Sequence, residues 1–251
     1  MTNSEFGLLT TFLLGIFILI GALIALLVNK KTKVMDFSIG LAFGVIVTLI
    51  VTDLLPEVYE SLGLKKIYLA IIFVVIGFYI LRLLDNFIPD HHEHHKMNNK
   101  ESKENLTHIG IITTIALVLH NIIEGMAVYT TSLTDTRSAL LLSIGVGFHN
   151  IPLGMVIASS FYQSSKELKK TIISVLLVSI STLIGGLIMY LFNLTSINDT
   201  ILGILLSLTL GMLLFIVIDE LYPRIRDTKD KKITYMGIGL GVIILLIGLF
   251  I

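Results

Sequence analysis

Long apolar segments constrain this chain more than any other feature. Eight of them follow one another, and each is close to the roughly 20 residues that a helix needs to cross a bilayer core. The predicted spans are Phe6–Val28, Val34–Leu54, Ile67–Leu84, Ile109–Thr130, Ser138–Ser160, Thr171–Phe192, Ile201–Leu221 and Ile233–Ile251. They leave no room for a separate soluble domain. We therefore predict an all-α polytopic membrane protein whose residues 1–251 form a single transmembrane domain.

Composition supports this prediction. Charged residues make up 14% of the chain, whereas soluble domains average about 25%. A soluble enzyme and a nucleic-acid-binding protein are therefore disfavoured, and we expect the lipid bilayer as a partner and no nucleic acid. The 18 basic and 18 acidic residues give the chain a formal net charge of zero. Because cysteine is absent, disulfides, thiolate metal sites and cysteine nucleophiles are excluded.

The basic residues are divided unequally between the two sides of the predicted membrane. The first, third, fifth and seventh connections hold 15 lysine and arginine residues, and the other side holds three. Basic residues gather on the cytoplasmic side of membrane proteins. We therefore predict a multi-pass plasma-membrane protein with both termini outside the cell and the long connection of residues 85–108 in the cytoplasm.

That long connection carries a histidine-rich tract at residues His91, His92, His94 and His95. Its polar composition favours a solvated linker. Short histidine-rich runs also bind borderline divalent ions, so a loose metal-collecting tract is the other interpretation. The residues do not decide between the two.

The most informative residues are those that do not belong in lipid. His120 and Glu124 lie at the middle of the fourth predicted span, one turn apart and so on one helix face. His149 lies at the middle of the fifth, and Asn121 and Asn150 directly follow the two histidines. Ionisable residues at this depth are costly and usually functional. Imidazole and carboxylate groups are ligands for divalent zinc, iron and manganese, so the pattern predicts a metal site at the midplane.

Further acidic residues lie at the predicted ends of two spans. Asp53 ends the second span toward the outside, and Asp219 and Glu220 end the seventh toward the cytoplasm. The simplest interpretation is that each is a solvated group at the membrane interface. Together they would also form an acidic entrance and exit that concentrate cations along a path through the midplane site.

These motifs resemble those of the ZIP family of divalent metal transporters. His120-Asn-Ile-Ile-Glu-Gly125 is similar to the family's HNxxEG motif, and His149-Asn-Ile-Pro-Leu-Gly154 is similar to its HNxPEG motif. Asp53-Leu-Leu-Pro-Glu57 and Glu220-Leu-Tyr-Pro223 resemble motifs at the ends of its second and seventh spans. The resemblance covers nearly the whole chain.

The resemblance implies a fold of eight spans in a 3+2+3 arrangement with an inverted repeat. It also implies that His120, Glu124 and His149 are primary metal ligands and that Asn121 and Asn150 are secondary ones. No resident cofactor is expected. The implied cargo is a divalent ion, Zn²⁺ first, with Fe²⁺, Mn²⁺, Co²⁺ and Cd²⁺ as alternatives, and the implied assembly is a homodimer.

Three positions depart from the family pattern. Leu153 stands where bacterial relatives have glutamate, Asp53 replaces a histidine, and the sixth span contains no acidic residue. The family's second metal ion depends largely on those missing carboxylates. We therefore predict one well-formed metal site in this chain instead of two.

The leading hypothesis is a divalent metal importer that carries ions from outside into the cytoplasm and is not an enzyme. The departures at Leu153 and in the sixth span motivate a second hypothesis, a transport-inactive metal sensor or structural subunit. An intramembrane metal-dependent hydrolase is a third. It is weakened because the chain has no HExxH motif and no polar midplane residue left over to act as a general base.

Overall fold

The apolar segments form helices because a backbone inside a bilayer must satisfy its own hydrogen bonds. The computed structural model describes residues 1–27, 33–87, 101–165, 168–228 and 230–249, and every regular element in those ranges is helical. The elements are α1 (Asn3–Leu27), α2 (Lys33–Leu49), η1 (Ile50–Leu54), α3 (Leu55–Leu62), η2 (Leu64–Lys66), α4 (Ile67–Phe87), α5 (Glu101–Thr134), α6 (Thr136–Ser165), α7 (Leu168–Leu191), α8 (Asp199–Phe215), η3 (Ile216–Leu221), α9 (Tyr222–Asp227) and α10 (Lys231–Leu249).

Among the described residues, 7 helical segments are long and apolar enough to cross a membrane. Two of them join consecutive elements: α2, η1 and α3 form one at Asp36–Leu62, and α8, η3 and α9 form another at Asp199–Asp227. These segments coincide with the first seven predicted spans. The last predicted span coincides with α10, a helix of 19 residues that is not among the 7.

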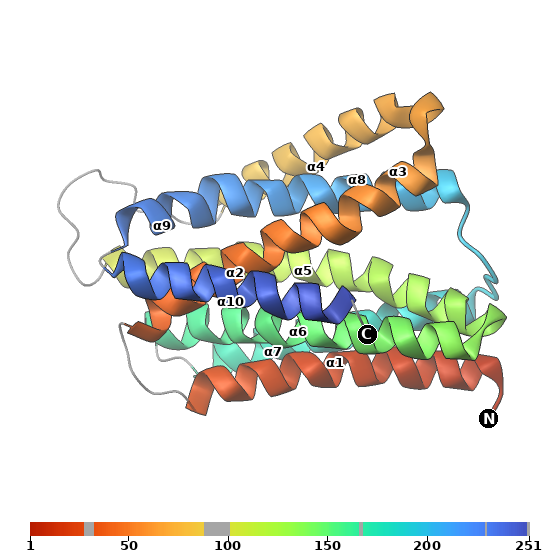
Figure 1. Cartoon of the computed structure of the whole chain (residues 1–251), viewed down its shortest axis with the longest axis horizontal. Coiled ribbons are helices and arrows are strands. Elements are labelled where there is room, and N and C mark those ends of the chain that lie inside the picture. Colours follow the sequence, from red (N-terminus) through yellow and green to blue (C-terminus); the bar gives the residue numbers. More distant parts are fainter. Residues whose placement is uncertain (28–32, 88–100, 166–167, 229, 250–251) are drawn as a thin grey trace.

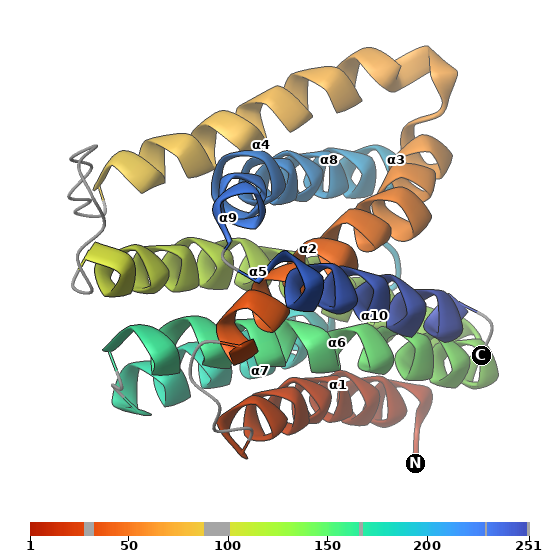
Figure 2. The same ribbon diagram turned by 60° about the vertical axis from the view of Figure 1, so that its left-hand side comes forward.

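The helices form two groups that pack side by side (Figures 1 and 2). In the first group, α1, α5, α6 and α7 all contact one another. In the second, α2 packs on α10, and α8 packs on both α3 and α4. Contacts of α6 with α2 and α10, and of α5 with α8, join the groups. The two helices that carry the His-Asn motifs therefore lie where the groups meet.

The helix ends alternate between the two ends of the molecule, as the predicted order of spans implies. The start of α1, the α3–α4 turn, the α5–α6 junction and the α7–α8 connection lie together at one end (Figure 1). The starts of α2, α5, α7 and α10 lie at the opposite end. We call the first of these the α3 end.

A single residue, Asp135, separates α5 from α6 and caps α6. Its carboxylate accepts hydrogen bonds from the backbone N–H of Arg137 at 3.0 Å and from the hydroxyl of Ser138 at 2.5 Å. These bonds favour the ionised form and hold the pKa of Asp135 below its ordinary value. Because the connection is so short, α5 and α6 run antiparallel side by side, which brings their motifs together.

Three helix boundaries differ from the predicted ones. Helix α5 begins at Glu101, so the helix already covers the end of the predicted loop of residues 85–108. The helix-favouring Glu and Lys residues there carry no apolar signal, which is why the pattern missed it. The second and seventh predicted spans end in the π-helical turns η1 and η3, and the chain stays helical past Leu54 and Leu221 as α3 and α9.

Candidate metal site

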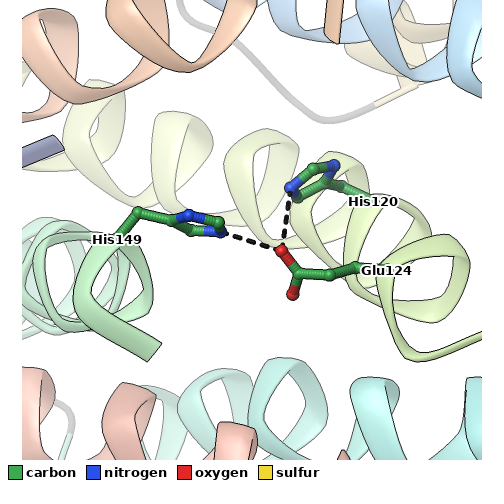
Figure 3. A group of neighbouring side chains, drawn as sticks. All are labelled: His120, Glu124 and His149. Carbon is green, nitrogen blue, oxygen red and sulfur yellow. Dashed lines mark hydrogen bonds and ion pairs between the residues drawn. The ribbon is translucent and has the colours of Figure 1, made fainter. Parts of the chain in front are cut away.

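The centre of the site is a cluster of three side chains from α5 and α6. One oxygen of Glu124, Oε1, lies 2.8 Å from Nε2 of His149 and 3.8 Å from Nε2 of His120 (Figure 3). The ligand atoms of the three residues all lie within 4.8 Å of one another. A cation placed among them would therefore meet two imidazole nitrogens and one carboxylate.

The cluster is withdrawn from solvent. Its side chains are between 6% and 9% exposed. Nε2 of His120 and Oε2 of Glu124 have no hydrogen-bond partner within the protein. Buried polar atoms without partners are costly, so these two atoms are free to bind something else. Among the described residues, this is the only group of three or more histidine or acidic side chains with metal-binding geometry.

The glycine that ends each motif lets the motif helix lie close to its neighbour. A β-carbon at Gly125 would overlap the carbonyl oxygen of Thr182 in α7, and one at Gly154 would overlap that of Ile18 in α1. Only a residue without a side chain permits such close backbone approach. The two glycines therefore fix α5 and α6 against their neighbours and hold the cluster in place.

The two motif asparagines are fully buried beside the cluster. Nδ2 of Asn121 donates a hydrogen bond to the carbonyl of Val178 in α7 at 3.3 Å, while its Oδ1 has no partner within the protein. Neither polar atom of the Asn150 side chain has one. Asn121 is thus held against α7, and three amide atoms remain available to a ligand.

A cavity of about 490 Å³ extends from the cluster to residues of α3. Asp53, Glu57 and Glu60 line it together with His120, Glu124 and His149, and it has no lysine or arginine among its described lining residues. We call Asp53, Glu57 and Glu60 the acidic vestibule. Sequence reasoning selected Asp53 as an entrance residue, quoted Glu57 only as part of the same motif, and did not consider Glu60. Their spacing of three and four residues on one helix was the signal that could have found them.

The remaining predicted residues lie elsewhere. Asp219 and Glu220 are in η3 and do not line the cavity. Leu153 is fully buried in the hydrophobic core, one turn beyond His149. The tract of His91, His92, His94 and His95 falls outside the described residues.

A helical membrane protein with a buried histidine and glutamate cluster behind an acidic cavity belongs to the class of metal-ion transporters. Comparison with known protein families identifies the family within this class. The family model described as "ZIP Zinc transporter" matches residues 88–248, which is well over half of the chain. The chain therefore belongs to the ZIP family, whose members are transporters and not enzymes.

Full-length relatives agree with this assignment. The chain is 28% identical to the zinc transporter ZupT of Clostridium perfringens, over 100% of this chain and 97% of the relative. It is 26% identical to ZupT of Oceanobacillus iheyensis, over 100% and 99%. With ZupT of Streptococcus mutans it shares 25% identity over 96% of this chain and 95% of the relative. Metal transport is thus the function that the family supports.

Proposed function

We propose that this chain carries divalent metal ions, zinc first, from outside the cell into the cytoplasm through the cluster of His120, Glu124 and His149. The observation that carries the proposal is the convergence of two imidazoles on one buried carboxylate. Family membership supports a zinc cargo. The same nitrogen and oxygen ligands suit Fe²⁺, Mn²⁺, Co²⁺ and Cd²⁺, which we propose as secondary cargoes.

The single negative charge of the cluster favours reversible binding of a divalent ion. Glu124 contributes one negative charge, so a bound divalent ion keeps about one net positive charge in a low-dielectric environment. Three protein ligands also leave zinc an open position in its usual tetrahedral shell. Both features weaken binding relative to a closed structural site. Transport requires binding that is favourable enough to enter and weak enough to leave.

We propose that the α3 end faces the outside. Glu57 and Glu60 of the vestibule belong to α3, which lies at that end (Figure 1), and a negative potential there would concentrate cations. The excess of basic residues in connections at the opposite end supports a cytoplasmic position for that end. Both termini are then extracellular, and Asp219 and Glu220 form an acidic group at the exit.

We also propose that α10 is an eighth span and that spans one to three and six to eight form an inverted repeat. Two matching segments support the repeat: Ile-Val-Thr-Asp53 and Ile-Val-Ile-Asp219 both form π-helical turns, and a proline follows each. The two segments are in different spans, one leaving toward each end of the molecule. We propose further that the protein forms a homodimer. We also propose that the histidine-rich tract of residues 91–95 collects metal ions.

Substitution of the histidines tests the proposal. Cells producing His120→Ala or His149→Ala should take up radioactive zinc no faster than cells with an empty vector, because each change removes a ligand. Ser207→Ala is the matched control, since Ser207 is equally buried but bonds only to its own helix through the carbonyl of Gly203. Unchanged uptake by either histidine variant at normal surface abundance would contradict the proposal.

The apolar Leu153 favours one other function, a metal sensor that does not transport. Experiments on the purified protein distinguish the two functions. A sensor binds zinc without moving it across a proteoliposome membrane, whereas the proposed importer does both. No observation in the described residues favours the hydrolase, and metal-dependent hydrolysis without transport would be needed to support it.

A further inference from the structure

We propose that Asn121, Asn150 and Thr182 form a neutral pocket beside the cluster that holds a water molecule, and that this water is the fourth ligand of the transported ion. This inference rests on the proposed function, because it concerns the same metal site. It adds Thr182, a residue that no sequence motif singles out, and it states in what form the ion is carried.

The pocket is defined by buried polar atoms that have no partner within the protein. They include Oδ1 of Asn121, both polar atoms of Asn150, Oγ1 of Thr182 and Oε2 of Glu124. The asparagine and threonine side chains are all 0% exposed. Buried hydroxyl and amide groups nearly always have hydrogen-bond partners, so these atoms, on three contacting helices, are available to a ligand.

The backbone places these residues around the cluster. Asn121 and Asn150 each directly follow a cluster histidine, in α5 and α6. Thr182 is in α7, and its carbonyl oxygen abuts Gly125, the residue after Glu124. Asn121 bonds to α7 at Val178, one turn before Thr182. The three residues thus come from three helices that all contact one another (Figure 2).

The chemistry of the pocket selects water over a second metal ion. Every side chain assigned to the pocket is neutral, and the only carboxylate of the cluster, Glu124, already faces the first ion. Leu153, one turn from His149, adds only apolar surface. A second divalent ion would lack a compensating charge at low dielectric. Buried water typically makes about three hydrogen bonds to such groups, and this pocket offers both donors and acceptors.

The water would complete the coordination of the cargo. Two imidazoles and one carboxylate leave a tetrahedral ion with one open position. A water bound there can donate hydrogen bonds through its two O–H groups to two of the side-chain oxygens of Asn121, Asn150 and Thr182. The ion then moves with part of its hydration shell retained, which lowers the desolvation cost of entry and speeds release.

Removal of the Thr182 hydroxyl tests whether the pocket holds a water that binds the ion. Thr182→Val keeps the shape of the side chain but removes a hydrogen-bonding group. We expect zinc affinity of the purified full-length protein to fall about fivefold, the equivalent of one hydrogen bond. X-ray absorption at the zinc edge should also show loss or lengthening of one oxygen ligand. Thr182→Ser, which keeps the hydroxyl, should restore both values.

Thr209→Val is the matched control, because Thr209 is buried in α8 and its hydroxyl bonds only to the carbonyl of Leu205. It should change neither the affinity nor the zinc ligands. If Thr182→Val likewise leaves both unchanged, the pocket is not a ligand site. A purely structural role for Thr182 would lower thermal stability without altering the zinc ligands, and that result would also overturn the inference.

Stoichiometry gives an independent test. The wild-type protein should bind one zinc ion per chain, and the double substitution Leu153→Glu with Thr182→Glu should raise this to two by adding the missing charge. Two ions bound to the wild type would overturn the inference but leave the proposed function intact. No zinc bound to the wild type would overturn both.

Discussion

Nε2 of His149 lies 2.8 Å from Oε1 of Glu124, although the two residues are 25 positions apart and belong to different helices. The contact depends on the one-residue junction at Asp135, which sets α6 antiparallel to α5. The contact places Glu124, the only carboxylate of the cluster, between two imidazoles. Glu124 is therefore the residue whose loss should affect the site most.

The Glu124→Gln substitution keeps the size of the side chain but removes its charge. We expect zinc affinity to fall by more than about 100-fold, because loss of groups that merely support metal ligands already costs 10- to 100-fold. Titration calorimetry of purified protein would measure this. Asp199→Asn, at an exposed position at the start of α8, should bind zinc like the wild type. Near-normal affinity in Glu124→Gln would place the ion elsewhere.

The acidic vestibule should act on the rate of ion entry. In the double variant Glu57→Gln with Glu60→Gln, we expect uptake at low zinc concentration to fall severalfold, while uptake at saturating zinc changes little. The difference should shrink at high ionic strength, because salt screens exposed charges. Initial uptake rates at two salt concentrations measure this. A deficit that persists at high salt and saturating zinc would argue against electrostatic capture.

Acid should weaken metal binding at the cluster. A histidine must be neutral to bind a metal, so protons compete with zinc at both His120 and His149. Binding is therefore strongest at neutral or higher pH and is lost as the pH falls toward about 6, the ordinary titration range of imidazole. Zinc affinities of purified protein between these pH values would show the slope. An affinity independent of pH in this range would exclude histidine ligands.

The close contact between the backbones at Gly125 and Thr182 should contribute to the stability of the fold. We expect Gly125→Ala to lower the free energy of unfolding by about 1–3 kcal/mol, because the added carbon overpacks against Thr182. Gly239→Ala is the control, since a β-carbon there meets nothing within 4 Å. Thermal unfolding in detergent compares the two. Equal melting temperatures would mean that α5 and α7 can separate without cost.

Much of the fold could be predicted from the sequence because a bilayer leaves little choice. Apolar segments of this length must be helical in a bilayer, and successive spans must run in alternating directions. The π-helical turns could not be predicted in this way. Ile50–Leu54 and Ile216–Leu221 are mostly apolar, and the pattern is compatible with any helix type.

The candidate site was partly predictable for a similar reason. His120 and Glu124 are one turn apart on one helix, so local geometry alone brings them together. Their convergence with His149 depends on how α5 packs against α6. The sequence predicted it from the equal depth of the two motifs in adjacent spans, and the family resemblance supported it. The spacing of Glu57 and Glu60 places them on one helix face with Asp53, but which face meets the cavity depends on helix packing. The position of the pocket residue Thr182 depends on packing in the same way.

Zinc flux into proteoliposomes tests the central claim most directly. Purified wild-type protein and Glu124→Gln would be reconstituted at equal density into vesicles that contain a zinc-sensitive dye. We predict a rapid rise in dye fluorescence with the wild type and a rate equal to that of protein-free vesicles with Glu124→Gln. Flux through Glu124→Gln at the wild-type rate, or no flux through the wild type, would contradict transport through this cluster.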